Sequence, residues 1–184
     1  MKPLLSFRPE PGNSATAARA RALALTPVQR PLFEVGAVPW AAPDPAAFDG
    51  LVLTSANALR HGGAELAKLT SLDVLAVGRA TADAARAAGF RVVMTGDGGV
   101  DKLLDVLPGE QHLLHLAGAD HHRVDTRHSV ETVTVYRAAT LTPRIPAGEF
   151  VALVHSPRAG ARFASLAQHR ATGKASFASR GERG

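Results

Sequence analysis

The 184-residue sequence contains no cysteine, one tryptophan and one tyrosine. Without cysteine there is no disulfide, no thiolate nucleophile and no cysteine-ligated metal, which argues against redox and thiol chemistry. With so few aromatic rings, and no interleaving of aromatic and basic residues, the sequence offers no stacking platform for single-stranded nucleic acid. No apolar run reaches about 18 residues and no charged-then-apolar leader is present, so we expect a soluble, cytoplasmic protein.

The formal net charge of +5 would by itself suggest a polyanionic partner. Much of this charge lies at the carboxyl end, where residues 167–184 contain four cations and one anion: Arg170, Lys174, Arg180, Arg183 and Glu182. That segment contributes +3 and the rest of the chain only +2. The body of the protein is therefore basic enough for a small acidic ligand but does not indicate a DNA-binding surface.

Short apolar runs alternate with alanine-rich stretches along the chain, a pattern typical of βαβ units and a parallel sheet. The apolar runs predict strands at residues 4–8, 32–38, 50–54, 74–77, 91–94, 113–116, 132–136 and 151–155. The stretches between them predict helices at residues 14–25, 56–69, 80–88, 100–107 and 159–167. The sequence therefore predicts an α/β protein.

Two proline-rich stretches, residues 35–50 and 138–149, divide the chain. Residues 37–140, which include everything between these two stretches, are enough for a complete α/β lobe. Residues 1–36 and 141–184 would together form a second, discontinuous lobe, and two linkers would join it to the first.

Polar residues follow three of the predicted strands at points where a helix is expected to begin. They are Thr54, Ser55 and Asn57 in LVLTSANALR, Gly78 and Thr81 in LAVGRATADAARAAGF, and Ser156 in ALVHSPRAGAR. In parallel sheets ligands bind beyond the carboxyl ends of strands, where helix N–H groups can hold a carboxylate or phosphate. These turns are candidate anion sites, although each hydroxyl could instead serve only as a helix cap.

Other features carry weaker indications of chemistry. The segment GDGGVDK, residues 96–102, lacks Walker spacing, and VGRATA is not a GxGxxG motif, so nucleotide binding is not indicated. Four histidines suggest a metal site at first sight: His115, His121, His122 and His128. The DHHR run that contains two of them fits a polar loop better than a set of metal ligands. His155 precedes Ser156 at a strand end, but Ser156 lacks the GxSxG elbow of a serine hydrolase.

The single tyrosine, Tyr136, ends the run VETVTVY. A phenol keeps its proton at neutral pH and can act as an acid or a hydrogen-bond donor. A tyrosine at a strand end can also simply cover the sheet, and the residues by themselves leave both interpretations open.

Six segments in order between residues 4 and 166 resemble the uroporphyrinogen-III synthase family: FRP, FDGLVLTSANALR, LAVGRATADAARAAGF, LLHLAGADHHR, VETVTVYRA and VALVHSPRAGARF. The resemblance implies two flavodoxin-like, parallel-sheet lobes joined by a two-stranded linker. It also implies a hydro-lyase of tetrapyrrole (haem) biosynthesis that needs no cofactor and no metal. The substrate would be hydroxymethylbilane, a linear tetrapyrrole polycarboxylate that is cyclised with inversion of ring D and loss of water.

The resemblance also assigns roles to residues by position. Tyr136 would assist departure of the hydroxyl group, and the substrate-binding residues would be Arg8, Thr54, Ser55, Asn57, Gly78, Thr81 and Ser156. A monomer acting on a small molecule, without nucleic acid or membrane as partner, is expected.

The sequence departs from the family pattern in two places. The spacing from Gly118 to Tyr136 is short, so the helix usual there is shrunken or replaced by a loop. The family also continues beyond the helix that follows Ser156, whereas this sequence ends ATGKASFASRGERG. We therefore expect a truncated terminal lobe with part of its sheet exposed, a disordered tail at residues 170–184, and reduced stability and activity.

Two alternatives to the enzyme remain open at this point. The chain could be a non-catalytic member of the same fold, or an unrelated two-lobe module that binds carboxylates or phosphates.

Overall fold

The structure, a computed structural model, describes residues 2–178 and divides into two compact units. Unit 1 comprises Met1–Glu34 and Ala139–Gly184, and unit 2 comprises Val35–Ala138. The boundaries predicted from the sequence fall after residues 36 and 140. No helix in the described part of the chain has both the length and the apolar character needed to cross a membrane.

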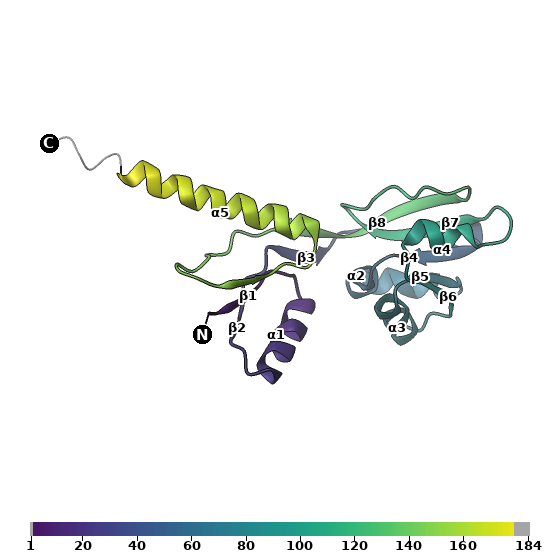
Figure 1. Cartoon of the computed structure of the whole chain (residues 1–184). Coiled ribbons are helices and arrows are strands. Elements are labelled where there is room, and N and C mark those ends of the chain that lie inside the picture. The colour runs from purple at the N-terminus through teal and green to yellow at the C-terminus, as the bar shows by residue number, and fades with distance from the viewer. Residues whose placement is uncertain (1, 179–184) are drawn as a thin grey trace. The chain divides into compact units, whose positions relative to one another are not determined.

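Unit 1 contains a three-stranded parallel sheet in the order β2-β1-β9. Its strands are β1 (Leu4–Ser6), β2 (Pro27–Gln29) and β9 (Val151–Leu153), and its helices are α1 (Gly12–Ala22) and α5 (Pro157–Ala178). Phe7, just past β1, is fully buried and packs against Phe163 of α5, with ring centroids 4.7 Å apart. Figure 1 shows these elements.

The short strand β2 is absent from the sequence prediction because its first residue is Pro27, which counts against a strand. Here β2 pairs only with β1 and lies at the edge of its sheet. A proline is tolerated at such a position because its missing N–H removes no bond from the interior of the ladder.

The carboxyl-terminal helix is longer than the sequence predicts. The prediction ends this helix at residue 167 and expects disorder from residue 170, whereas α5 continues to Ala178. The sequence-based expectation of a disordered tail at residues 170–184 stays a prediction, and residues 179–184 lie outside the described residues. The stretch from 168 to 178 contains no proline and only one glycine, so nothing in it breaks a helix that has already begun.

Unit 2 contains most of a six-stranded sheet in the order β3-β8-β7-β4-β5-β6. The strands are β3 (Phe33–Ala37), β4 (Gly50–Leu53), β5 (Val74–Val77), β6 (Val92–Gly96), β7 (His112–Gly118) and β8 (Ser129–Thr140). The pairs β8-β7, β7-β4, β4-β5 and β5-β6 are parallel. The adjacent strands β3 and β8 are the segments that pass between the units, which confirms the predicted two-stranded linker.

Helices cover both faces of the unit 2 sheet. Successive side chains of each strand point to opposite faces, so the strands contribute to two separate cores. Leu51 and Leu53 pack in one core with α2 (Ala56–His61), α3 (Arg79–Ala87) and the 3₁₀ segment η2 (Gly63–Leu69). Val52 packs in the other core with α4 (Val100–Asp105). A further 3₁₀ turn, η1 (Pro45–Ala47), precedes β4.

The single helix predicted for residues 56–69 is divided into α2 and η2 at Gly62 and Gly63. Gly63 has φ +64°, a left-handed conformation that ends the α-helix. A Cβ at Gly62 would lie 2.7 Å from the carbonyl oxygen of Ala58, so no larger residue fits without movement.

The strand order of unit 2 reverses at β4, with β5 and β6 on one side and β7 and β8 on the other. In open parallel sheets such a reversal opens a crevice beyond the carboxyl ends of the two central strands. The residues that follow β4 and β7 therefore lie where a ligand is expected to bind.

Residues 119–128 connect β7 to β8 without a helix, as the short spacing in the sequence predicts. His128, 6% exposed, fixes the end of this loop. Its Nδ1 accepts a hydrogen bond from the Gln111 N–H at 3.2 Å, and its Nε2 lies 3.0 Å from the Leu104 carbonyl oxygen. Because Nδ1 is an acceptor, the ring proton lies on Nε2 and is donated to Leu104, so both ring nitrogens are occupied.

We expect His128→Ala to lower the free energy of unfolding by about 2 kcal/mol, because a buried N–H and a buried carbonyl lose their partner. Urea unfolding at pH 7 measures this change, with His122→Ala, at an exposed position, as the matched control. A loss below about 0.5 kcal/mol, within the range of ordinary surface substitutions, would contradict the assignment.

Candidate active site at the carboxyl edge of the unit 2 sheet

Six of the eight predicted site residues lie toward one edge of the unit 2 sheet. Thr54 and Ser55 follow β4, Asn57 opens α2, Gly78 follows β5, Thr81 lies in the first turn of α3, and Tyr136 pairs with the last residue of β7. Because β4, β5, β7 and β8 are parallel, their carboxyl ends lie at the same edge. The structure therefore brings these six positions to the same edge of one sheet.

The Ser55 turn is a capped helix start. Ser55 has extended backbone, and its Oγ accepts a hydrogen bond from the Asn57 N–H at 3.2 Å. The Asn57 side chain is also engaged, because its Oδ1 accepts from Arg60 Nη1 at 3.0 Å. The turn thus holds an exposed guanidinium against the Asn57 side chain, and Arg60 is a residue that the sequence prediction did not select.

The Gly78 turn has a different construction. Gly78 has φ +82°, which favours glycine, and its N–H donates to the Gly96 carbonyl of the neighbouring strand β6. The N–H of Thr81 donates back to the Gly78 carbonyl at 3.1 Å. Thr81 itself is only 5% exposed, so its hydroxyl is the least accessible of those predicted for the site.

Tyr136 is held at the sheet edge by a glycine and a β-bulge. Between Ala117 and Gly118 the pairing with β8 skips one residue, so that Gly118 pairs with Tyr136. A bulge of this kind re-aims the side chain that follows it. Both Val135 and Tyr136 consequently contact the core beneath α2, although strict alternation would put them on opposite faces.

Gly118 provides the space that the phenol ring occupies. A Cβ at Gly118 would lie 2.5 Å from Tyr136 Cε2 and 3.0 Å from its hydroxyl oxygen. The ring therefore lies directly against the backbone at the end of β7. The ring also lies near His61 of α2, whose ring centroid is 6.3 Å from that of Tyr136.

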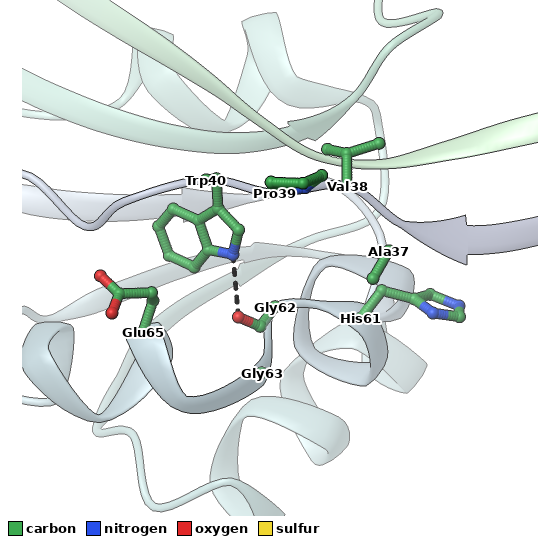
Figure 2. Close-up of a pocket in the computed structure, with 8 residues that line it drawn as sticks. All are labelled: Ala37, Val38, Pro39, Trp40, His61, Gly62, Gly63 and Glu65. Atoms are coloured by element: carbon green, nitrogen blue, oxygen red, sulfur yellow. Dashed lines mark hydrogen bonds between the residues drawn. The ribbon is translucent and has the colours of Figure 1, made fainter.

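A shallow pocket with a volume of about 430 Å³ adjoins His61. It is lined by Ala37, Val38, Pro39, Trp40, His61, Gly62, Gly63 and Glu65. Figure 2 shows Trp40 and Glu65 toward one end and His61 at the other, with Trp40 Nε1 donating to the Gly62 carbonyl at 2.8 Å. The hydrogen bond from the Ala42 N–H, followed by that from Lys68, holds the pKa of Glu65 below its usual value.

Thr54 makes a partly buried polar contact at the point where the strand order reverses. Its Oγ1 lies 3.1 Å from Nε2 of His115, which is 1% exposed in the middle of β7. Burial, together with the nearby His121, lowers the pKa of His115 to about 4. The imidazole is therefore neutral at physiological pH.

The predicted histidine group does not assemble into a metal site. His115 lies in a strand, His128 is engaged with backbone groups, and His121 Nδ1 lies 3.0 Å from the Gly118 carbonyl. Among the described residues, no group of three or more metal-ligating side chains is placed to hold an ion. One sequence signal for His115 was available, because it is the only polar residue in the otherwise apolar run LLHLA.

The remaining two predicted residues, Arg8 and Ser156, belong to unit 1. Arg8 follows β1, lies against Gly12 and donates from Nη1 to Thr16 Oγ1 at 3.4 Å. Ser156 follows β9 and caps α5, with its Oγ accepting from the Ala159 N–H at 3.2 Å. Since β1 and β9 are parallel neighbours, these two residues lie at the same edge of the unit 1 sheet.

The protein has two α/β units, each with a parallel sheet, and paired strands join the two units. Polar turns follow the carboxyl ends of the strands in both sheets, which is where α/β proteins of this class bind ligands. The chain belongs to the uroporphyrinogen-III synthase family, whose model, described as Uroporphyrinogen-III synthase HemD, matches residues 14–183. This match confirms the resemblance identified from the sequence.

Two solved structures support the same fold. Uroporphyrinogen-III synthetase from Helicobacter pylori is 15% identical with a TM-score of 0.60, and the alignment covers 90% of this chain and 78% of that one. A mutant uroporphyrinogen III synthase from Thermus thermophilus is 20% identical with a TM-score of 0.53, covering 76% of this chain and 64% of that one. No curated protein sequence matches the chain significantly.

Gly118→Ala should fold and displace the ring of Tyr136, because the clashing atoms belong to a side chain that can move. Incorporated 3-fluorotyrosine labels this single tyrosine, so one ¹⁹F resonance reports its environment. We expect a clear chemical-shift change in Gly118→Ala. The control is Gly36→Ala, since a Cβ at Gly36 meets nothing within 4 Å; equal spectra for both variants would contradict the packing role of Gly118.

The buried His115 makes folding pH-dependent. Its pKa is lowered in the folded state from 6.5 to about 4, so between these values the unfolded chain binds the proton and the folded chain does not. Stability is thus complete above pH 6.5 and falls as the pH decreases toward 4, by up to about 3 kcal/mol.

Substitution of His115 by a residue that does not titrate should remove this contribution. Urea unfolding of wild type and His115→Gln at pH 7 and pH 4.5 gives the difference directly, because carboxylate titration is common to both proteins. His122→Gln should behave like wild type. The same loss of stability between the two pH values in His115→Gln would show that His115 does not cause it.

Proposed function

We propose that the chain is a uroporphyrinogen-III synthase, which cyclises hydroxymethylbilane to uroporphyrinogen III with inversion of ring D and loss of water in tetrapyrrole biosynthesis. Membership of the family supports this proposal. The observation that carries it furthest is the placement of the sole tyrosine, fitted against Gly118 at the same sheet edge as the hydroxyl and N–H groups that follow β4 and β5.

Tyr136 acts as the acid in the first step. Its phenol donates a proton to the hydroxyl group of the terminal hydroxymethyl carbon, and the C–O bond breaks to release water. The resulting azafulvene is attacked by an α-pyrrole carbon to give a spiro intermediate, which rearranges to the inverted ring. The proton lost when the attacked pyrrole ring regains its aromaticity restores the phenol, so hydroxymethylbilane gives uroporphyrinogen III and one water.

The polar turns bind the carboxylates of the substrate. Thr54 and Ser55 supply hydroxyl donors, Gly78 lies at the start of α3 where helix N–H groups are available, and Arg60 adds one positive charge. Asn57 and Thr81 shape these two turns. Uncharged donors hold several carboxylates without tight binding to any one of them, which suits a substrate that must rearrange.

Arg8 and Ser156 are carboxylate-binding residues of unit 1 in this proposal. Their support is their shared position beyond the adjacent strands β1 and β9. Within unit 2, the pocket beside His61 offers Val38, Pro39 and Trp40 as an apolar wall for a pyrrole ring. Holding the two ends of the bilane in one geometry supplies much of the rate enhancement in such a cyclisation.

The proposal further includes a cytoplasmic monomer that acts on this small molecule without a cofactor and without nucleic acid or membrane as partner. The modest charge of the chain outside residues 167–184 supports a small acidic ligand. Light scattering on the purified chain measures the oligomeric state, and a stable dimer would contradict that part of the proposal.

The experiment that tests the function supplies hydroxymethylbilane to the purified chain and separates the type I and type III isomers of the product. Type III should predominate, whereas spontaneous closure gives type I. Tyr136→Phe should lower kcat by on the order of 100-fold with little change in KM, because only the transferred proton is lost. Gly36→Ala, whose added methyl group meets no other atom within 4 Å, serves as the control.

Three other outcomes have distinct meanings. Only type I product would contradict the proposed activity. Binding of the bilane without turnover would instead indicate a non-catalytic member of the same fold. Unchanged kcat in Tyr136→Phe would remove the acid role and leave Tyr136 as a packing residue.

A further inference from the structure

We propose that His115 is a positioning residue that fixes the Thr54 hydroxyl as a hydrogen-bond donor directed toward a substrate carboxylate. The inference rests on the proposed function for the identity of the carboxylate. Its structural part, the direction of a hydrogen bond between two named side chains, stands on geometry alone.

The position of His115 makes the contact with Thr54 specific. Strands β4 and β7 are the two at which the strand order reverses, and Val52 pairs with His115 in their register. Thr54 comes two residues after Val52, so both side chains belong to the same face of the sheet. The Oγ1 to Nε2 distance of 3.1 Å is that of a direct hydrogen bond.

The other ring nitrogen decides which atom donates. His115 Nδ1 is buried and has no hydrogen-bond partner among the described residues. A neutral imidazole carries its proton on one nitrogen only, and a buried N–H without a partner is rarer than a buried acceptor without one. The proton therefore lies on Nε2, and Nε2–H donates to Thr54 Oγ1.

This direction determines what Thr54 offers to a ligand. A hydroxyl has one donor and two acceptor positions, and the bond from His115 occupies an acceptor. The O–H of Thr54 is then free to donate outward from a side chain that is only half-buried. With the opposite tautomer, the O–H would point at Nε2 and only oxygen lone pairs would face a carboxylate, which repel it.

Burial stabilises the required form. His115 is 1% exposed, and its lowered pKa keeps the ring neutral at physiological pH. The other group that lowers the pKa of His115 is His121, whose ring makes an edge-on contact with centroids 6.0 Å apart. His121 Nδ1 is itself directed at the Gly118 carbonyl, so it does not supply a partner for His115 Nδ1.

The tautomer can be measured without any substrate. Long-range ¹H–¹⁵N correlation spectra of the ¹⁵N-labelled full chain distinguish protonated from unprotonated ring nitrogens for each of the eight histidines. The His115 signals are assigned by their loss in His115→Gln. We expect an unprotonated Nδ1 and a protonated Nε2 at pH 7. A protonated Nδ1 would overturn the proposal whether or not the chain is active.

The effect of this hydrogen bond on substrate binding is measured by comparing the changes in KM and in kcat of variants. Thr54→Val and His115→Leu should each raise KM for hydroxymethylbilane about tenfold with little change in kcat, since the first removes the outward donor and the second removes the bond that directs it. Thr54→Ser should restore KM, and His115→Gln, which retains a side-chain N–H, should lie closer to wild type than His115→Leu. Urea unfolding of each variant controls for loss of folded protein.

A double variant tests whether Thr54 and His115 act on substrate binding through the same hydrogen bond. The double variant Thr54→Val, His115→Leu should raise KM no more than either single substitution, because both act on one hydrogen bond. Multiplied effects, or an unchanged KM in a folded His115→Leu, would overturn the positioning role. If wild type gives no type III product, the proposed function fails, and the NMR result still decides the direction of the hydrogen bond.

Discussion

The pairing of β4 with β7 is the interaction on which the candidate site depends. The four residue pairs from Gly50↔Leu113 to Leu53↔Leu116 set the register at which the sheet reverses its order. That register places Val52 beside His115 and so brings Thr54 within hydrogen-bond distance of the imidazole. A shift of one residue would turn every side chain of β4 to the opposite face and separate the two cores from their helices.

A steric constraint at the end of β7 complements this register. The bulge opposite Ala117 and Gly118 turns Tyr136 toward α2, and the absence of a side chain at Gly118 leaves room for its ring. Regular alternation would have left the phenol on the α4 face. The catalytic group of the proposed reaction is therefore positioned by one irregularity in the strand pairing and one missing Cβ.

The sequence predicted those features that depend on residues close together in the chain. Short apolar runs located the strands of unit 2, and hydroxyl residues after β4, β5 and β9 located the turns, because both signals depend on neighbours in the chain. Non-local features could not be predicted. The pairing of His115 with Thr54, 61 residues away, and the fit of Tyr136 against Gly118 depend on a register that no short segment encodes. The extension of α5 beyond residue 167 was not predicted, although residues 168–178 contain no proline.

The central claim is that the carboxyl edge of the unit 2 sheet, beside Tyr136, is where the tetrapyrrole binds. The most direct test is a titration of the chain, labelled with 3-fluorotyrosine at its single tyrosine, with the product uroporphyrinogen III under reducing, anaerobic conditions. The account predicts that the one ¹⁹F resonance shifts and saturates together with binding measured independently by equilibrium dialysis. Saturable binding that leaves the resonance unchanged would contradict it.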